Sequence, residues 1–399
     1  MIKSMLDNDQ YKFMMQQAAL LLGYGNVPVE YKFHCRTPNV DLLPAMNHLN
    51  EGLNEILNLR MKSHDLDYLE SMRYIKPAYL SFMKDFRFRE EYLKIDYTFR
   101  DGLKVPQIRI CGPFFHTTLF EVPLLATISE SWSRLDSANE DLAWRRLKAS
   151  INEAKIYQSD ESIVQLPPDF YFADFGTRRR RSYDWQDKVV GYLKGDQLNS
   201  FVGTSNVHLA RKHGIKSIGT QAHEWYQLHQ QLDYRLIDFQ KAALENWVKV
   251  YRGDLGIALA DIINTEAFLK DFDDTYFCKL FDGVREDSEK IPVQFGHEII
   301  NFYIRKNINP RTKSIVFSNS LTFNKAIDIW QELHNLIGLS FGIGQHLMNN
   351  WGVEGLNIVI KMVRCNDQPV AKISNSPGKG MCESPEFVSY LKSVFGVLD

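Results

Sequence analysis

Residues 199–225, NSFVGTSNVHLARKHGIKSIGTQAHEW, carry the pattern that predicts the fold of this chain. Each half of the stretch begins with a short apolar run, which stops at Gly203 and again at Gly219. A helical pattern follows each stop. A short buried strand followed by a helix is the repeating unit of α/β proteins, so the stretch predicts two consecutive units of that kind.

The same pattern recurs from about residue 165 to residue 348. Further units read FYFADFGTRRR, DLGIALADIINTEAFLKDF, FDGVREDS, KSIVFSNSLTFNKAIDIW and LSFGIGQHL. Such a series favours an α/β fold, an irregular TIM-like barrel of parallel strands with outer helices. An open, doubly wound sheet would also place the strand ends at one edge, so it stays an alternative.

The chain divides into three predicted segments. Residues 1–140 mix helical and strand-like stretches and are expected to form an α+β domain. Residues 141–350 are expected to form the barrel that carries the active site. Residues 351–399 contain two apolar runs, LNIVIKMVRC and QPVAKISNS, typical of a hairpin that packs with the first domain or caps the barrel.

Composition narrows the class of protein. The formal net charge of −2 gives no reason to expect nucleic-acid binding. The first residues, MIKSMLDNDQYKFMM, lack the apolar core of a signal peptide, and no apolar stretch is long enough for a membrane helix. Five scattered cysteines fit reduced thiols. We therefore expect a cytoplasmic protein that acts on small molecules.

Polar, charged or glycine residues follow every predicted strand. Arg178 and Arg285 suit bidentate binding of carboxylates or phosphates. Glycine-rich turns such as FGIG let backbone N–H groups approach a phosphate. Asp261 and Asp287 are candidates for holding Mg²⁺ or ribose hydroxyls. The strand ends together predict a phosphate-handling enzyme with an anionic substrate and Mg²⁺.

Each of these residues also has an ordinary structural explanation. An arginine run is usually a solvated face, and paired glycines often form only a tight turn. Asp261 has the residue type of a helix N-cap, while Tyr11 and Phe175 are typical core aromatics. What these explanations leave open is why the polar residues recur at successive strand ends.

His223 stands beside a glutamate in the first turn of a predicted helix. A helical zinc site needs a second histidine four residues on, but Gln227 occupies that position and the next histidine is His229. Zinc is therefore set aside. The remaining interpretations are a helix-start or core histidine and a catalytic histidine.

The chain resembles the nicotinate phosphoribosyltransferase family over almost its whole length. The resemblance rests on LDNDQYKFMMQQA, DFGTRRR, FVGTSN, GTQAHEW, LGIAL, IVFS, FGIG, LNIVIK and SPGK, in family order. It implies an enzyme that joins nicotinate to 5-phosphoribosyl-1-pyrophosphate in NAD salvage, giving nicotinate mononucleotide and pyrophosphate. It also implies ATP and Mg²⁺ as cofactors, a classification as a ligase, and a homodimer with a shared active site.

The resemblance also implies roles for single residues. His223 matches the histidine that the family phosphorylates from ATP. Phe175 is expected to stack on one face of the pyridine ring, and Tyr11 on the other, from the partner subunit. Arg178 and Arg285 are expected to face the nicotinate carboxylate and the pyrophosphate.

The remaining strand ends complete the implied site. Asp261 and Asp287 are expected to position ribose and metal, and Gly342 and Gly344 to cradle the 5-phosphate. Other strand-end residues are expected to contact substrate, namely Thr204, Ser205, Ser318 and Asn319. Related nicotinamide enzymes carry an aspartate at the position of Ser205, and a hydroxyl there could donate to a carboxylate, which favours nicotinate.

Three positions depart from the family pattern. Glu289 and Lys290 replace a glycine and an aspartate after Asp287, and Asn319 replaces an aspartate. Two alternatives therefore stay open. One is a phosphoribosyltransferase for nicotinamide or another pyridine, and the other is a weakened ligand-binding protein on the same fold.

Overall fold

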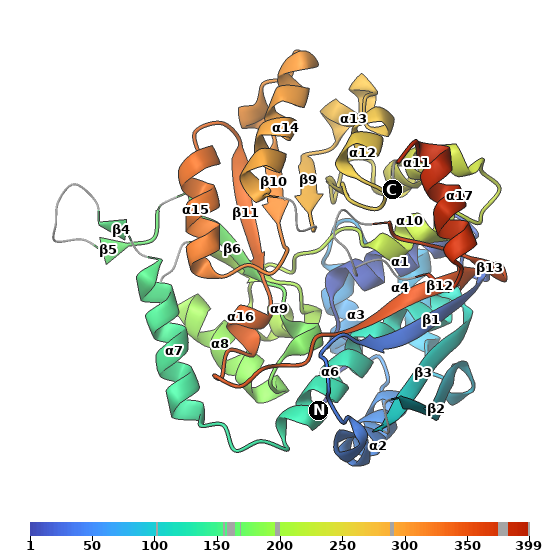
Figure 1. Cartoon of the computed structure of the whole chain (residues 1–399), viewed down its shortest axis with the longest axis vertical. Coiled ribbons are helices and arrows are strands. Elements are labelled where there is room, and N and C mark those ends of the chain that lie inside the picture. Colours follow the sequence, from blue (N-terminus) through green and yellow to red (C-terminus); the bar gives the residue numbers. More distant parts are fainter. Residues whose placement is uncertain are drawn as a thin grey trace.

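A parallel sheet of six strands forms the centre of the molecule in the computed structural model (Figure 1), which describes residues 1–100, 103–154, 156–157, 164–167, 169–195, 200–287, 291–373 and 382–397. The strands run in the order β7-β6-β11-β10-β9-β8. Their bounds are β6 (Tyr171–Asp174), β7 (Phe201–Thr204), β8 (Ile257–Leu259), β9 (Gly283–Glu286), β10 (Ser314–Phe317) and β11 (Gly338–Ile343). All five ladders between neighbours are parallel, as the repeated strand-helix pattern predicts.

The two outer strands of this sheet, β7 and β8, are joined by the irregular segment 216–220. Its backbone bonds to Thr204 at two points, where Thr204 N donates to Lys216 O and Ile218 N donates to Thr204 O, at 3.2 and 2.9 Å. On the other side, Thr220 Oγ1 donates to Ile257 O at 2.9 Å. The barrel is thus irregular, because a side-chain hydrogen bond replaces a backbone ladder at this position.

Helices cover the outside of this sheet. They are α8 (Tyr183–Gly195), α9 (Val207–His213), α10 (His223–His229), α11 (Phe239–Tyr251), α12 (Thr265–Asp271), α13 (Thr275–Leu280), α14 (Pro292–Arg305), α15 (Phe323–Leu333) and α16 (Gln345–Met348). Local sequence starts several of them. Asn206 caps α9 and Asn264 caps α12, each side chain accepting a backbone N–H of the first turn. Asp261 is therefore not the cap of α12.

A second, antiparallel sheet combines both ends of the chain. Its order is β13-β12-β1-β3-β2, with β1 (Pro28–Cys35), β2 (Leu93–Arg100), β3 (Leu103–Pro113), β12 (Ile358–Cys365) and β13 (Gln368–Pro369). The expected C-terminal hairpin is β12 and β13, and β12 pairs with β1 from Val29–Cys365 to Cys35–Ile358. The last segment of the chain therefore packs with the first.

The remaining elements belong mainly to the first part of the chain. They are α1 (Gln10–Leu21), α2 (Leu43–Asn58), α3 (Ser63–Glu70), α4 (Pro77–Asp85), α5 (Phe114–Thr117), α6 (Glu121–Ser133), α7 (Glu140–Glu153), the short β4 (Ile156–Tyr157) and β5 (Val164–Gln165), and α17 (Pro385–Phe395). Residues of α1 and α6 are buried almost throughout. Gln10 N donates to Ser205 O at 2.8 Å, so α1 begins at the end of β7. Among the described residues, no helix has the length and apolar character needed to cross a membrane.

Candidate active site

His223, Asp261 and Lys372 form a compact buried cluster. His223 Nε2 lies 3.0 Å from Asp261 Oδ1 and 2.7 Å from Lys372 Nζ, and Lys372 Nζ lies 2.6 Å from Asp261 Oδ2. Asp261 stands two residues after β8, and His223 is the first residue of α10. The histidine side chain is 16% exposed, whereas the other two are almost fully buried. The cluster therefore presents the imidazole to the exterior and hides the ion pair behind it.

Charge and burial keep His223 neutral. Burial, reinforced by the Lys372 ammonium, lowers the pKa of His223 to about 4. Burial alone would raise the pKa of Asp261, but Lys372 and His223 lower it. The cluster at neutral pH is thus an imidazole beside a carboxylate–ammonium pair.

A second group of predicted residues lies at the neighbouring strand ends. Asp287 follows β9 and accepts from Ser318 Oγ at 3.1 Å, while Arg285 Nη2 lies 3.5 Å from Asp287 Oδ2. Arg285 Nη1 also donates to Gln221 O at 3.2 Å. Asp287 interacts electrostatically with His223 and Asp261. Strands β8, β9 and β10 therefore bring the predicted residues to one edge, as parallel strands require.

Two further cations, Lys361 on the antiparallel sheet and Arg179 in the turn after β6, interact electrostatically with Asp287. Burial lowers the pKa of Lys361, on β12, to about 7, with Lys372 and Arg36 acting in the same direction and Asp287 and Asp261 acting against it. Burial, together with Arg178 and Arg36, lowers the pKa of Arg179 to about 10. Positive charges that depress one another's pKa values favour a polyanion, which would relieve their repulsion.

The aromatic residues expected around a pyridine ring lie near Arg178. Tyr11 of the same chain interacts electrostatically with Arg178. Phe175 packs over Gly342, where an added Cβ would meet the ring at 2.3 Å, and an added Cβ at Gly344 would lie 3.0 Å from Phe175 O. The glycines therefore have a packing reason, and their phosphate role stays a prediction, as does the supply of Tyr11 by a partner subunit.

The hydroxyls of Thr204 and Ser205, which were predicted to contact substrate, donate hydrogen bonds to buried carboxylates instead. Thr204 Oγ1 donates to Asp174 Oδ2 at 2.7 Å, and Ser205 Oγ donates to Asp9 Oδ1 at 2.7 Å. All four residues are buried. A hydroxyl has one hydrogen to donate, so Ser205 has none left for a nicotinate carboxylate. The selectivity argument from Ser205 is therefore not supported.

The two predicted metal ligands have different neighbours. Both oxygens of Asp261 already face buried partners, Lys372 and His223, so a cation there would have to displace an ammonium. A role of Asp261 as a Mg²⁺ ligand stays a prediction. Among the described residues, Asp287 has hydrogen-bond or ion-pair contacts to Arg285, which is long, and to the Ser318 hydroxyl, and one carboxylate together with substrate phosphates is a usual Mg²⁺ environment. The described residues contain no group of three or more metal-ligating side chains.

The positions that depart from the family pattern lie partly outside the described residues. Residues 288–290, with the replacements Glu289 and Lys290, and the SPGK motif at 376–379 lie outside the described residues. Asn319 follows Ser318 and accepts from Ser320 Oγ at 3.3 Å. The homodimer with a shared site stays a prediction.

Several residues of the site were not predicted from sequence. Lys372 reaches Asp261 because Ile373 N donates to Ile262 O at 3.0 Å, which joins the segment after β13 to the segment after β8. Lys12 and Glu224 stand beside Tyr11 and His223 in the sequence and form a buried ion pair. Their positions next to predicted site residues were the only available signal.

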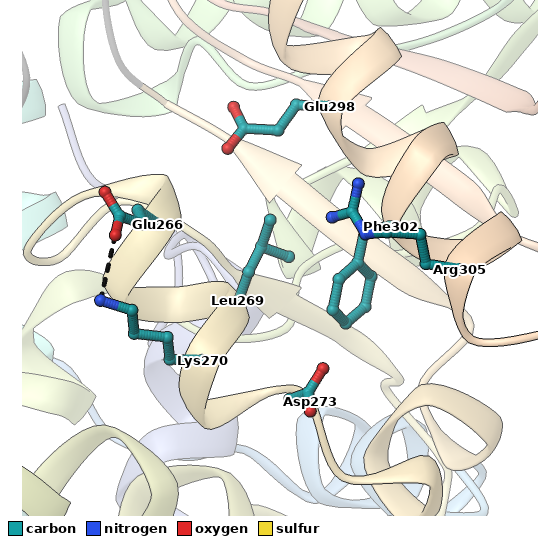
Figure 2. Close-up of a pocket in the computed structure, with 7 residues that line it drawn as sticks. All are labelled: Glu266, Leu269, Lys270, Asp273, Glu298, Phe302 and Arg305. Carbon is teal, nitrogen blue, oxygen red and sulfur yellow. Dashed lines mark ion pairs between the residues drawn. The ribbon is translucent and has the colours of Figure 1, made fainter.

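A surface cavity lined by other residues lies between two helices of the parallel sheet's outer layer. It has a volume of about 360 Å³ and lies between α12 and α14 (Figure 2). Its lining includes Glu266, Lys270 and Arg305 over the apolar Leu269 and Phe302. No predicted site residue lines it, so its size does not make it the candidate active site.

Comparison with known families agrees with the geometry. Residues 170–398 match the model of the nicotinate phosphoribosyltransferase family, and residues 6–129 match the model of that family's N-terminal domain. The nicotinate phosphoribosyltransferase of Xylella fastidiosa (strain Temecula1) is 46% identical over 400 residues, covering 99% of this chain and 98% of that protein.

Solved structures of similar fold carry the same name. The crystal structure of nicotinate phosphoribosyltransferase from Vibrio cholerae superimposes with a TM-score of 0.92 at 33% identity, covering 100% of this chain and 94% of that chain. The enzyme from Porphyromonas gingivalis gives a TM-score of 0.88 at 32% identity, covering 99% and 100%.

Proposed function

This chain belongs to the nicotinate phosphoribosyltransferase family, and we propose that it couples nicotinate mononucleotide synthesis to ATP hydrolysis through a phosphorylated His223. The phosphoribosyl transfer in NAD salvage follows from the family. The coupling, the residue roles and Mg²⁺ are the proposed part. The observation that carries the coupling is the neutral His223 held between Asp261 and Lys372.

We propose Nδ1 as the phosphate acceptor. Nε2 can donate to Asp261 or accept from Lys372, but not both at once. In the proposed tautomer, Nε2–H donates to Asp261 Oδ1, while Lys372 donates to Asp261 Oδ2. The lone pair then lies on Nδ1, to which no described residue forms a hydrogen bond. A carboxylate that orients an imidazole and supports its positive charge is a common arrangement for a nucleophilic histidine.

In the first step of the proposed mechanism, the terminal phosphoryl group of ATP passes to His223. The Nδ1 lone pair attacks the terminal phosphorus of ATP, the phosphorus–oxygen bond to ADP breaks, and ADP leaves. Asp261 stabilises the positive charge that develops on the ring. Lys361, Arg179 and Lys372 supply positive charge that offsets the phosphate oxygens. Mg²⁺, held by Asp287 and the phosphates, would supply further charge neutralisation.

The glycosidic step uses the other half of the site. The pyridine nitrogen attacks the anomeric carbon while the bond to pyrophosphate breaks, through a cationic sugar. Arg178 bonds to Glu121 through Nη1 at 3.2 Å and is 43% exposed, so its remaining N–H groups suit the nicotinate carboxylate. Tyr11 and Phe175 supply aromatic faces for the ring. The protein's contribution is alignment and charge stabilisation.

The decisive experiment measures nicotinate mononucleotide formation from nicotinate, 5-phosphoribosyl-1-pyrophosphate and Mg²⁺, with and without ATP. We expect ATP to stimulate product formation and an acid-labile phosphate to appear on His223. The His223→Ala variant should lose ATP hydrolysis and retain a slow reaction that ATP does not stimulate. Unchanged ATP hydrolysis in that variant would remove His223 from the mechanism.

Nicotinamide serves as the competing substrate in the same assay. Because Ser205 is bonded to Asp9, the preference for nicotinate is assigned to Arg178 rather than to Ser205. Arg178→Gln should therefore raise the KM for nicotinate strongly and that for nicotinamide little. An equal rise for both substrates would refute this assignment.

A further inference from the structure

Four side chains of alternating charge connect Arg178 to helix α10. Lys12 Nζ lies 2.5 Å from Glu121 Oε2 and 2.6 Å from Glu224 Oε1. On its other side, Glu121 accepts from Arg178 at 3.2 Å. We call Arg178, Glu121, Lys12 and Glu224 the charge chain. Thr118 Oγ1 adds a neutral hydrogen bond to Glu224 Oε1 at 3.0 Å.

The inner members of the charge chain are isolated from water. Lys12 is fully buried, and the two glutamate side chains are nearly so. An ion removed from water costs several kcal/mol unless a counter-charge lies against it. Each inner charge here therefore depends on its neighbours. If Glu224 moves, Lys12 must follow or lose its partner, and the same holds for Glu121.

Members of the charge chain belong to the proposed site or stand next to its residues in the sequence. Glu224 follows His223 in the first turn of α10, and Lys12 follows Tyr11 in α1. Consecutive residues of a helix point about 100° apart, so Glu224 faces α1 while His223 faces Asp261. Arg178 forms the outer end. The charge chain thus joins the phosphate acceptor to both groups proposed to bind nicotinate, without using the substrates.

We propose that Lys12, Glu121 and Glu224 are positioning residues that transmit the phosphorylation state of His223 to Tyr11 and Arg178, so that it sets the affinity for nicotinate. This proposal rests on the proposed function. A phosphoryl group adds between about one and two negative charges to the residue next to Glu224. The displacement of His223 that accommodates it carries Glu224, and through Lys12 it shifts the start of α1 and the carboxylate that holds Arg178.

The test compares the KM for nicotinate with and without ATP in the wild-type enzyme and in the Glu224→Gln variant. Coupling between two sites of a protein is typically about 5–150-fold in affinity. We expect a ratio in that range for the wild type and a ratio near one for the variant. Glutamine keeps the size and the acceptor oxygen but removes the charge. His223 phosphorylation is quantified in the same samples. This distinguishes a KM ratio near one that results from failed transmission from one that results from absent phosphorylation.

Two further variants separate transmission from simple stability. Lys12→Gln combined with Glu224→Gln removes one charge of each sign and leaves Arg178 paired with Glu121. We expect this double variant to recover much of the thermal stability lost in Glu224→Gln, but not the KM ratio. Recovery of both would mean that the residues act only structurally. Thr118→Val, which removes the neutral hydrogen bond to the same oxygen, should keep the wild-type ratio.

Glu121→Gln breaks the charge chain at its other end and tests the proposal should Glu224→Gln fold poorly. A folded variant of either kind with the wild-type ratio overturns the inference alone. A wild-type enzyme whose KM does not respond to ATP, and whose His223 carries no phosphate, overturns the proposed function as well.

Discussion

Two buried aspartates at ends of the same parallel sheet have opposite surroundings. Asp174, the last residue of β6, accepts three hydrogen bonds, from Gly176 N, Gln186 Nε2 and Thr204 Oγ1, at 2.7 to 2.8 Å. Asp261, after β8, faces Lys372 and His223. Burial raises the pKa of Asp174 to about 6, because its donors are neutral. The buried cation lowers that of Asp261.

This difference in the charge of the neighbours distinguishes a structural carboxylate, Asp174, from one proposed to take part in the reaction, Asp261. The neutral donors of Asp174 tie the end of β7 and helix α8 to the turn that carries Arg178, so this carboxylate holds the loop in place. The partners of Asp261 are groups that a phosphate can recruit. A buried carboxylate therefore has to be judged by the charge of its neighbours, since both aspartates are buried and both stand at or just after the end of a parallel strand.

The largest loss of stability among the variants that test this difference is expected for Asp261→Asn. It leaves the buried Lys372 ammonium without its carboxylate, and breaking a buried ion pair by removing one partner typically costs about 3–5 kcal/mol. We expect a loss of that size in the free energy of unfolding in urea. The double variant Asp261→Asn/Lys372→Met should recover most of it. A single variant as stable as the wild type would show that the pair is not buried in solution.

Asp174→Asn should cost less, about 1–3 kcal/mol, because no charge is stranded. The amide oxygen can take the place of Oδ2, which accepts from both Thr204 and Gln186. The amide nitrogen then faces Gly176 N, so this one donor loses its partner. The matched variant Thr204→Val removes one of these bonds from the other side and should give a loss of similar size. Urea unfolding of both variants measures it, and a loss as large as that of Asp261→Asn would erase the distinction.

The two carboxylates should also respond oppositely to pH. The folded-state pKa of Asp174 is raised from 3.8 to about 6, so the folded state takes up a proton first as pH falls through this window, which adds stability. The gain is up to about 1.4 kcal/mol per pH unit and is absent in Asp174→Asn. For Asp261, with its lowered pKa, stability is lost only as pH falls below 3.8. The difference in unfolding free energy between wild type and Asp174→Asn, measured at pH 7 and pH 5, should therefore grow at the lower pH.

The smallest effect is expected for an ion pair that water reaches. Glu266 and Lys270 on α12 lie 3.0 Å apart beside the surface cavity (Figure 2), with side chains 75% and 69% exposed. Glu266→Gln should change the free energy of unfolding by less than about 1 kcal/mol. The change should shrink further in high salt, unlike that of Asp261→Asn. Urea unfolding at low and high salt provides the check.

Most of the fold could be predicted because its signal is local. Short apolar runs that stop at glycine or polar residues marked β6 to β11, and a helical pattern followed most of these runs. The unit at residues 216–225 was predicted as a full strand and helix, yet only Ser217 forms a bridge. Gly219 has a φ of +154°, which ends the extended pattern and turns the chain toward α10.

The candidate site was predictable only where strand ends supply it. Asp261, Arg285 and Asp287 were found in this way, whereas the catalytic role expected of His223 came from the family resemblance. All four side chains lie in one region of the structure. Lys372 comes from the segment after β13, and Lys12 comes from helix α1. Neither carries a strand-end signal, so only the packed structure reveals them. Thr204 and Ser205 also stand at a strand end, but a hydroxyl serves a neighbouring carboxylate as readily as a substrate.

The position of β12 has a consequence for biosynthesis. This strand lies inside the antiparallel sheet, between β13 and β1, although it follows all six strands of the parallel sheet in the chain. A nascent chain that ends before residue 358 leaves one edge of β1 open and Asp261 without Lys372. Such an edge is prone to pair with other chains, so the interval before β12 emerges from the ribosome is when chaperone protection matters most. The ion pair between Lys372 and Asp261 can then form only after the strand that pairs with β1 has been made.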